Sequence, residues 1–321
     1  MKLEQLRPMK AVTAELPVDE HGWAFEIKWD GMRILTVIRP DAFSLWSGNG
    51  IDASNRYPEL APIADALRGH TVVLDGEVVA FDDNGRPSFG RLQHRMHVGN
   101  AAEIRRLMES VPVTYVVFDL LHLDGHDVMA LPYVERRRLL RELVADDGAW
   151  TVPAHRLEGE GASLLEAAKE QGLEGVMAKR LDSPYLPGKR SPAWRKAKAR
   201  PQQEFVVGGW QPGEGNREGY LGSLLVGVYE SGKLRYCGKV GTGFSSRELE
   251  RLRPLLTERE TDTSPFDPAP PRLVSRSARW TRPELVAEVQ FGEWTEEGIL
   301  RHPSYLGLRD DKAPTDVVRE G

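Results

Sequence analysis

The sequence predicts an α+β fold in two parts: a mixed domain built mainly on antiparallel sheet, followed by a small β-barrel. Strand-like runs rich in Val, Ile and aromatic residues dominate residues 1–200, and only two segments between them have helical spacing. The pattern changes at Arg200-Pro201, beyond which short strands alternate with glycine-rich turns. We therefore expect one domain over residues 1–200 and a second over residues 201–321.

The elements of the first domain follow from its apolar periodicity. Apolar residues at helical spacing predict helices over Leu131–Val144 and Ser163–Gln171. Runs of β-branched and aromatic residues predict strands at six places: Trp23–Trp29, Arg33–Arg39, Thr71–Phe81, Thr114–Leu121, Glu174–Arg180 and Ala193–Lys198.

The second domain combines short strands with one helix, expected at Ser246–Leu256. A proline-rich loop is expected at Ser264–Pro271. Strands are expected at Glu204–Trp210, Leu221–Glu230, Lys233–Val240 and Leu285–Trp294. Several short strands around one helix are typical of a five-stranded barrel of the oligonucleotide-binding (OB) type.

The composition and charge exclude several classes of protein. No run approaches the ~20 apolar residues of a transmembrane helix. The single cysteine, Cys237, allows neither an intramolecular disulfide nor a cysteine zinc site, which favours a reducing cytoplasm. The net charge is -5, so affinity for nucleic acid must come from basic patches at residues 179–200 and 272–282. A charge run is more often simply a solvated face.

Lys28 is the centre of the chemical interpretation. It ends a strand in Glu26-Ile27-Lys28-Trp29-Asp30-Gly31-Met32-Arg33, directly before an Asp-Gly turn. An isolated lysine at a strand end is usually a solvated charge. A nucleophilic lysine needs a deprotonated amine, and neighbouring cations and a metal would favour that state by lowering its pKa.

Suitable partners recur later in the chain. Asp75-Gly76-Glu77 places acids inside an apolar strand, where they are costly unless paired or bound to metal. Phe118 could cover a flat base, although a core position is commoner for phenylalanine. Glu174-Gly175-Val176-Met177-Ala178-Lys179 adds an acid and a cation on one strand. Lys196 and Lys198 share a face of their strand, and a phosphate is the natural anion between them.

This order of motifs resembles the nucleotidyltransferase series of the ATP-dependent DNA ligases. The series reads Lys-x-Asp-Gly-x-Arg, Asp-Gly-Glu, Phe-Asp, Glu-Gly-Val-Met-x-Lys and Trp-x-Lys-x-Lys. Pro8-Met9-Lys10-Ala11 resembles the opening motif of the family. The run from Trp294 to Lys312 resembles its last motif and is most similar to the ligases of bacterial non-homologous end joining. Each motif alone is weak, but all of them in one order are a specific signal.

The resemblance implies an adenylation domain over residues 1–200, an OB-fold domain over residues 201–321, and a role for each matching residue. Lys28 would attack the ATP α-phosphate, and Glu77 and Glu174 would hold Mg²⁺ or Mn²⁺, with Glu77 also placed to contact ribose. The adenine would lie between Phe118 and Val176 with Glu26 at its edge. The remaining contacts to ribose, phosphate or DNA are implied for Arg33, Arg190, Lys196 and Lys198, and contacts to the leaving pyrophosphate for Arg301, Arg309 and Lys312.

One position departs from the family pattern. The family usually has Ser-Arg-Asn-Gly where this chain has Ser47-Gly48-Asn49-Gly50. The missing arginine normally helps to bind the nucleotide or the nick. Either a neighbouring cation substitutes for it, or activity is reduced.

The resemblance also implies nicked double-stranded DNA as substrate, end-binding repair proteins as partners, a monomer, and a place in the bacterial cytosol. Three alternatives stay open at this stage: an RNA ligase, a capping-type guanylyltransferase that uses GTP, and a catalytically weak module that senses breaks. An NAD-dependent ligase is disfavoured, because those enzymes carry a cysteine zinc site and this chain has one cysteine. An unrelated α/β protein would require the ordered motifs to be coincidence.

Overall fold

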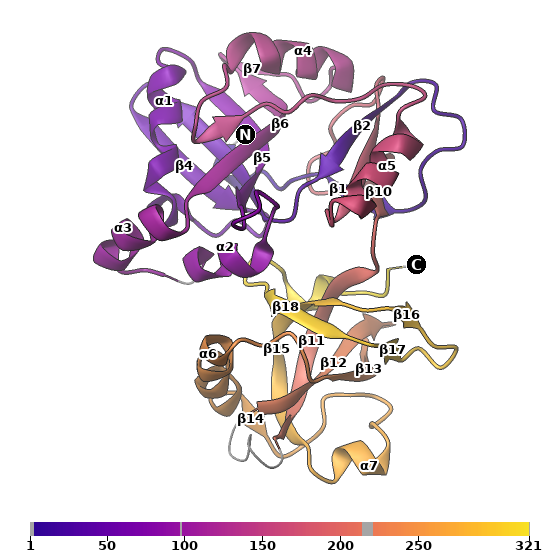
Figure 1. Cartoon of the computed structure of the whole chain (residues 1–321). Coiled ribbons are helices and arrows are strands. Elements are labelled where there is room, and N and C mark those ends of the chain that lie inside the picture. The colour runs from indigo at the N-terminus through magenta and orange to yellow at the C-terminus, as the bar shows by residue number, and fades with distance from the viewer. Residues whose placement is uncertain (1–2, 97, 214–220, 321) are drawn as a thin grey trace. The chain divides into compact units, whose positions relative to one another are not determined.

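Two sheets form the first of two units, Met1–Ala199, in the computed structural model, which describes residues 3–96, 98–213 and 221–320 (Figure 1). The larger sheet has the order β4-β3-β5-β6-β7, with β8 beside β6, and the smaller has the order β1-β10-β9-β2. The bounds in the larger sheet are β3 Met32–Arg39, β4 Ala42–Ser47, β5 Val72–Ala80, β6 Val113–Leu123, β7 His126–Asp127 and β8 Trp150–Thr151. Those in the smaller sheet are β1 Lys10–Thr13, β2 Trp23–Lys28, β9 Gly175–Arg180 and β10 Arg190–Lys198.

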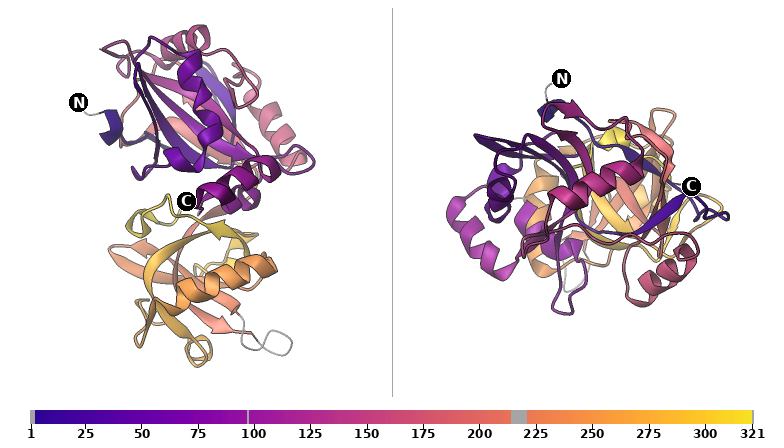
Figure 2. Two further views of the ribbon diagram at one scale, coloured as in Figure 1. Left: turned by 90° about the vertical axis from the view of Figure 1, so that its left-hand side faces the viewer. Right: turned by 90° about the horizontal axis from the view of Figure 1, so that it is seen from above.

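The helices of this unit cover the outer faces of the two sheets. They are α1 Pro62–Ala66, α2 Phe89–Met96, α3 Ala101–Ser110, α4 Tyr133–Leu143 and α5 Gly161–Glu170, with short 3₁₀ turns at Leu3–Gln5, Ser54–Arg56 and Pro58–Leu60. Within the unit, α5 lies beside the smaller sheet, on the opposite side from α1 and α3 (Figures 1 and 2).

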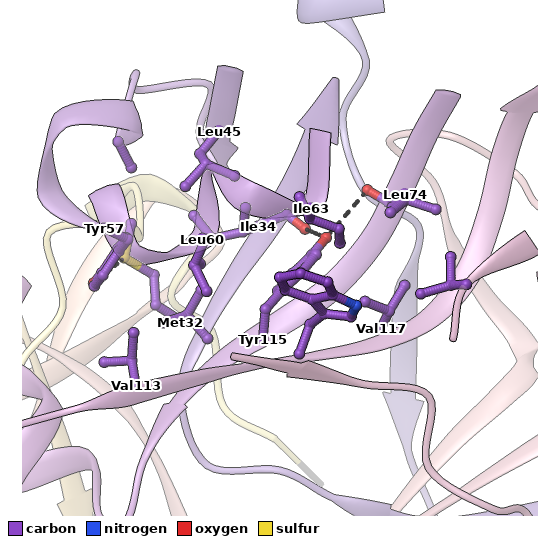
Figure 3. Close-up of a cluster of buried hydrophobic side chains, with 14 of the residues drawn as sticks. Met32, Ile34, Leu45, Tyr57, Leu60, Ile63, Leu74, Val113, Tyr115 and Val117 are labelled. Carbon is purple, nitrogen blue, oxygen red and sulfur yellow. Dashed lines mark hydrogen bonds between the residues drawn. The ribbon is translucent and has the colours of Figure 1, made fainter. Parts of the chain in front are cut away.

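A large apolar core fills the space behind the larger sheet. Met32, Ile34 and Leu74 extend from its strands toward side chains such as Leu60 (Figure 3). Tyr115 brings a polar group into this core, and its hydroxyl donates to the carbonyl oxygens of Ile34 at 3.0 Å and Leu74 at 3.4 Å. Buried hydroxyls are costly unless they are bonded in this way.

Tyr115 also explains the glycine in the Asp75-Gly76-Glu77 motif. A Cβ on Gly76 would lie 2.5 Å from the Tyr115 ring. Only glycine therefore fits between the two acids without displacing a core side chain.

A second apolar cluster joins the facing surfaces of the two sheets. Leu35, Val73 and Phe118 come from the larger sheet, and Met9 and Trp194 come from the segments around the smaller one. Because side chains alternate along a strand, every second residue of the central strands points into this space between the sheets. Polar residues at those positions meet one another there.

The second unit, Arg200–Gly321, has its own sheet and its own core. Its sheet has the order β13-β12-β11-β15-β14, with β18 beside β15, and a separate hairpin pairs β16 with β17. The strands are β11 Gln202–Pro212, β12 Leu221–Glu230, β13 Lys233–Val240, β14 Glu260–Thr261, β15 Arg279–Gln290, β16 Glu293–Trp294, β17 Leu300–Arg301 and β18 Ser304–Leu308. The helices are α6 Ser246–Thr257 and α7 Arg272–Ser275, with a 3₁₀ turn at Pro314–Asp316.

The structure confirms the expected fold class and the helices and strands that periodicity predicted. The bounds of one expected strand differ from those observed. In place of a strand over Leu285–Trp294, β15 runs from Arg279 to Gln290 and the separate β16 follows it. The elements that the sequence did not reveal are short or weakly patterned: β1, β4, β7, β8, β14, β17, β18, α1, α2, α3 and α7. No helix among the described residues is long and apolar enough to cross a membrane.

Candidate active site

The register of the smaller sheet places the motif residues on one face. Lys28 is the last residue of β2 and pairs with Gly175, and Glu26 pairs with Met177. On the next strand, Lys196 pairs with Met177 and Lys198 pairs with Gly175. Directly paired residues point to the same face of a sheet, so these side chains all face the space between the sheets. The predicted common face of the two β10 lysines is therefore present.

The Lys28 ammonium is held by an acid. Its Nζ donates to Oε2 of Glu174, whose side chain is nearly buried. Burial alone would lower the pKa of Lys28, but the carboxylates of Glu174, Glu77 and Asp30 outweigh it and raise the pKa above its ordinary value. In the free protein Lys28 is therefore protonated, and the lowering of its pKa by neighbouring cations and a metal stays a prediction for the loaded site.

Gly31 has a packing role in the turn after Lys28. A Cβ at this position would collide with the carbonyl oxygen of Val78 on β5 and would lie 3.0 Å from Cγ of Glu77. The glycine lets the end of β2 approach the strand that carries Glu77. The Asp-Gly dipeptide thereby brings Lys28 of one sheet toward an acid of the other.

Arg33 lies across the site from Lys28, on the larger sheet. Its Nε and Nη2 donate to the two carboxylate oxygens of Asp75 at 2.5 and 2.6 Å, and Asp75 also accepts from the Tyr185 hydroxyl at 2.6 Å. Asp75 is fully buried, so this network satisfies the acid that the sequence marked as costly. Arg33 pairs with Glu77 across the strands, and its guanidinium carbon lies 4.7 Å from the centre of the Phe118 ring.

A buried ion pair closes the other end of the site. Lys179 donates to Oε2 of Glu26 at 2.7 Å, and the Tyr133 hydroxyl donates to Oε1. Burial tends to raise the pKa of Glu26. The positive charge of Lys179 and the hydrogen bonds that Glu26 accepts from Lys179 and Tyr133 outweigh burial and lower this pKa below its ordinary value. Burial lowers the pKa of Lys179. Each Glu26 oxygen has a second lone pair, so the carboxylate can still accept from a ligand amine.

Phe118 faces the same space and has cations over its ring. It is 8% exposed, and the Lys179 Nζ lies 4.4 Å from the ring centre. Trp194 meets it edge-on at 6.4 Å. Phe118 is thus both a member of the inter-sheet cluster and a wall of the site.

The structure corrects the expectation for Val176. Val176 pairs with Ile27, not with Glu26 or Lys28, and is fully buried with Phe25 and Ala168 in the cluster beneath α5. Its side chain therefore points away from Lys28. Met177, the next residue, is half-buried, points to the Lys28 face and packs against the cluster that contains Phe118.

Arg190 lies at the start of β10, away from the Lys196 end of the strand. Its side chain is exposed, and its Nη1 donates to the carbonyl oxygen of Ala11 at 2.7 Å. The basic run at residues 179–200 does not form one solvated face. Lys179 is buried inside the site, and the Arg195 guanidinium stacks over Trp23 at 4.7 Å on the opposite side of the sheet.

The three cations expected to act from the second unit differ in how firmly they are held. Arg309 is 9% exposed and donates to Asp311 at 2.8 and 2.9 Å and to Glu288 at 2.8 Å. The Lys312 Nζ lies 2.9 Å from Oε1 of Glu204. The Arg301 Nη1 lies 2.9 Å from Oε1 of Glu293, and the Arg301 side chain is 60% exposed. Arg309 is therefore a buried internal ion-pair partner, which does not fit the expected phosphate contact.

The residues present fit a divalent cation that is shared with phosphate oxygens. Among the described residues, no group of three or more His, Cys, Asp or Glu side chains forms a complete metal site. Glu174 and Glu77 both act on the Lys28 ammonium, so two carboxylates already surround one cation. Mg²⁺ characteristically uses one or two carboxylates together with substrate phosphates.

Sequence reasoning missed four contributors to this site: Met177, Tyr133, Tyr185 and Asp75 as the partner of Arg33. Counting alternate residues places Met177 on the same face as Lys179, but only the register with β2 identifies that face as the one that carries Lys28. The two tyrosines lie outside the strand motifs, and the sequence carries no signal that brings their hydroxyls to Glu26 and Asp75.

These features define a nucleotidyltransferase domain followed by an OB-fold domain. Residues 7–198 match the family described as ATP dependent DNA ligase domain, and residues 217–312 match the ATP dependent DNA ligase C terminal region. The chain therefore belongs to the ATP-dependent DNA ligase family.

The relatives point to one branch of that family. The chain is 42% identical over 320 residues to the multifunctional non-homologous end joining DNA repair protein LigD of Mycobacterium tuberculosis, covering 99% of this chain and 40% of the relative. It is 35% identical to LigD of Pseudomonas aeruginosa, covering 99% and 37%. A structure of mycobacterial DNA ligase D complexed with ATP and MES is 41% identical, with a TM-score of 0.70 and full coverage of both chains. The chain spans about two fifths of the length of these curated relatives.

Proposed function

We propose that this chain seals nicks between a 5′-phosphate and a 3′-hydroxyl in double-stranded DNA, using ATP and a lysyl-AMP intermediate on Lys28. One observation carries the proposal. Lys28 shares its face of the smaller sheet with Lys196 and Lys198, while Glu174 and Glu77 act on its amine. That combination provides a nucleophile, two acids and two cations in one space, as phosphoryl transfer to an amine requires.

The reaction proceeds in three transfers. In the first, the Lys28 amine attacks the α-phosphorus of ATP, a P–N bond forms, and the bond to pyrophosphate breaks. In the second, an oxygen of the DNA 5′-phosphate attacks the same phosphorus, and Lys28 leaves as the amine. In the third, the 3′-hydroxyl attacks the activated DNA phosphate and AMP leaves. Lys196 and Lys198 offset the negative charge on the transferred group.

The nucleotide base would lie between the sheets, beside the buried end of the site. Phe118 provides one aromatic wall, and Met177 takes the place that was expected for Val176. Glu26 is fixed by Lys179 and Tyr133, so its oxygens can accept from the adenine amine without moving. Glu77 and Glu174 would hold Mg²⁺ or Mn²⁺, which supplies positive charge against the phosphates when it is bound.

The second unit contributes cations in two ways in this proposal. Lys312 and Arg301 are the exposed members of the last motif and are suited to contact the leaving pyrophosphate. Arg309 acts indirectly, because its pairs with Glu288 and Asp311 fix the segment that carries Lys312. We place the protein in the bacterial cytosol as a monomer that repairs DNA breaks with end-binding proteins. The name of the LigD relatives, a non-homologous end joining DNA repair protein, supports the repair role.

Glu174 should control the pH dependence of the first transfer. In the wild-type protein, the raised pKa of Lys28 leaves little free amine near neutrality, so the rate of adenylation rises between about pH 7 and pH 9. Replacing the carboxylate by an amide in Glu174→Gln removes the largest of the charges that oppose burial, and the pKa of Lys28 falls relative to wild type, with Glu77 and Asp30 still acting on it. Single-turnover labelling with α-³²P-ATP across this range should show a profile that is displaced to lower pH. If the adenylation rate of Glu174→Gln is lower than that of wild type but depends on pH in the same way, Glu174 does not control the pKa of Lys28.

Alanine variants of Met177 and Val176 should have different effects: one should weaken ATP binding, and the other should lower stability. Met177→Ala removes a wall of the base site and should raise the KM for ATP in adenylation roughly tenfold, with a small change in unfolding free energy. Val176→Ala removes a side chain buried under α5 and should cost on the order of 1–2 kcal/mol of stability with an unchanged KM. Initial-rate kinetics and urea unfolding measure both. The reverse pattern would restore the original assignment of Val176.

The proposed function is tested by turnover on a nicked duplex, with ATP, GTP and NAD supplied in parallel. We expect closed product with ATP alone and a preference for DNA over a nick that has RNA on one strand. Labelling by GTP in place of ATP would indicate a guanylyltransferase, and a preference for RNA would indicate an RNA ligase. Binding to the nick without turnover would indicate a module that senses breaks.

A further inference from the structure

We propose that Arg7 contacts a backbone phosphate of the DNA substrate, at the place where Gly48 provides no side chain. This inference rests on the proposed function, because it assigns a contact to the same DNA. It concerns one exposed guanidinium that none of the motifs includes.

Gly48 lies at the edge of the site and leaves open space there. Ser47, the last residue of β4, pairs with Ile34, the neighbour of Arg33 on β3. A tight turn follows, closed by the bond from the Gly50 N–H to the Ser47 carbonyl at 2.7 Å. A Cβ on Gly48 would meet only Cγ of Pro8, at 3.8 Å. A longer side chain could therefore start from this position without a clash, and this chain has none.

The Arg7 guanidinium lies against the same turn. A Cβ on Gly50 would come within 2.5 Å of Cζ of Arg7, so the planar group packs directly on the backbone at Gly50. Gly50 also has a φ of +76°, which glycine adopts without strain. The absence of side chains on this turn thus leaves a place for the guanidinium of a residue far away in the sequence.

The guanidinium has donors to spare. Arg7 is exposed, and its Nη1 donates to the carbonyl oxygen of Leu6 at 3.0 Å and weakly to that of Gln5 at 3.4 Å. Within the described part of the chain, Arg7 has no carboxylate partner. A planar guanidinium with free N–H groups is well matched to the oxygens of a phosphate.

Other exposed cations surround Arg7. The Gly188 N–H donates to the Arg7 carbonyl at 2.9 Å, which sets Arg7 beside the loop that carries Lys189. Lys10 pairs with Arg190 in the β1–β10 register, and both are exposed. Together these side chains give the rim positive charge, which attracts a polyanion.

The same rim is joined to the catalytic site. The Arg33 Nη2 donates to the carbonyl oxygen of Met9, two residues after Arg7, at 3.4 Å. A DNA strand that brings its 5′-phosphate to Lys28 can therefore continue over Arg7 along this segment. The contact reads no base, so it should give affinity without sequence preference.

The test compares Arg7→Ala with Arg68→Ala, which removes an exposed arginine paired with Asp65 outside this rim. Binding of the adenylated 321-residue chain to a nicked duplex is measured by fluorescence anisotropy at several salt concentrations. We expect Arg7→Ala to weaken binding roughly five- to twentyfold and to reduce the salt slope by about one. Lysine adenylation, measured without DNA, should stay within about twofold of wild type. Arg68→Ala should match wild type in all three measurements.

A second substitution tests directly whether a cation at position 48 can replace Arg7. Gly48→Arg in the Arg7→Ala background should recover most of the lost affinity, because position 48 has room and borders the same surface. Equal affinity and salt slope in Arg7→Ala and wild type would overturn the proposal, as would a loss of affinity that Gly48→Arg does not repair. Failure of the proposed function is a different result, namely a wild-type protein that does not close nicks.

Discussion

Lys28→Ala should lose covalent labelling by α-³²P-ATP altogether, a reduction of at least on the order of 10³-fold. The reason is geometric as well as chemical. Lys28 is the lysine held between Glu174 and the turn that approaches Glu77, whereas Lys179 is buried against Glu26. Loss of the Lys28 side chain leaves no amine at the same position.

Lys169→Ala is the matched control, because Lys169 is an exposed lysine on α5 that pairs with Glu166. It should be labelled like the wild-type protein. Labelling is measured by gel after acid quenching, with circular dichroism to confirm that both variants are folded. A folded Lys28→Ala protein that still carries labelled AMP would show that another side chain is the nucleophile.

Arg136→Met should destabilise the first unit by about 3–5 kcal/mol. Arg136 and Asp119 are both fully buried, and the guanidinium donates to the two carboxylate oxygens at 2.7 and 2.9 Å. It also donates to the carbonyl oxygens of Leu131 at 2.6 Å and Ser183 at 3.0 Å. Methionine fills a similar volume but leaves the buried Asp119 charge without its cation, with the Leu120 N–H still donating to Oδ1, and removes the bonds to two carbonyl groups.

Arg138→Met provides the comparison on the same helix. Arg138 is 54% exposed and pairs with Glu135 and Glu142 on the surface of α4, so its loss should change the unfolding free energy by less than about 0.5 kcal/mol. Urea unfolding followed by fluorescence measures both variants. Similar stabilities for the two variants would mean that the buried pair with Asp119 contributes little. This pair also explains why an acid follows Phe118: it anchors α4 beside the strand that carries the aromatic ring.

The sequence was sufficient for the order of the motifs and for most of the strands. Lys196 and Lys198 share a face because alternation along a strand depends only on counting residues, whereas Lys28 joins that face through the pairing of β2 and β10 with β9. The error at Val176 has the same physical basis. Alternation leaves two choices of face, and which face is the site depends on the register between β2 and β9, which a single sequence does not determine.

Charge pairing was the second part that the sequence could not provide. Arg309 is followed in the sequence by charged residues, a pattern typical of an exposed segment, yet it is buried between Glu288 and Asp311. The partner Glu288 is distant in sequence and reaches Arg309 only because β15 pairs with β18. Likewise, the raised pKa of Lys28 results from acids on three separate segments.

Short helices were missed although one of them carried a readable signal. Asn100 caps α3, and its side chain accepts from the N–H groups of Ala102 and Glu103. Asparagine before a helical pattern is a recognised start signal. The helix has only 10 residues, and its apolar face is narrow, with Ile104 and Leu107 as its buried members.

The most direct test of the account follows one AMP group from the protein to the DNA. The chain is labelled with α-³²P-ATP, freed of nucleotide and pyrophosphate by gel filtration, and then mixed with a nicked duplex in the presence of magnesium. We predict that the label leaves Lys28, passes through adenylated DNA and appears as free AMP, with about one nick closed for each labelled chain. Label that stays on the protein while nicks close, or closure that occurs only when fresh ATP is added, would contradict Lys28-AMP as the intermediate.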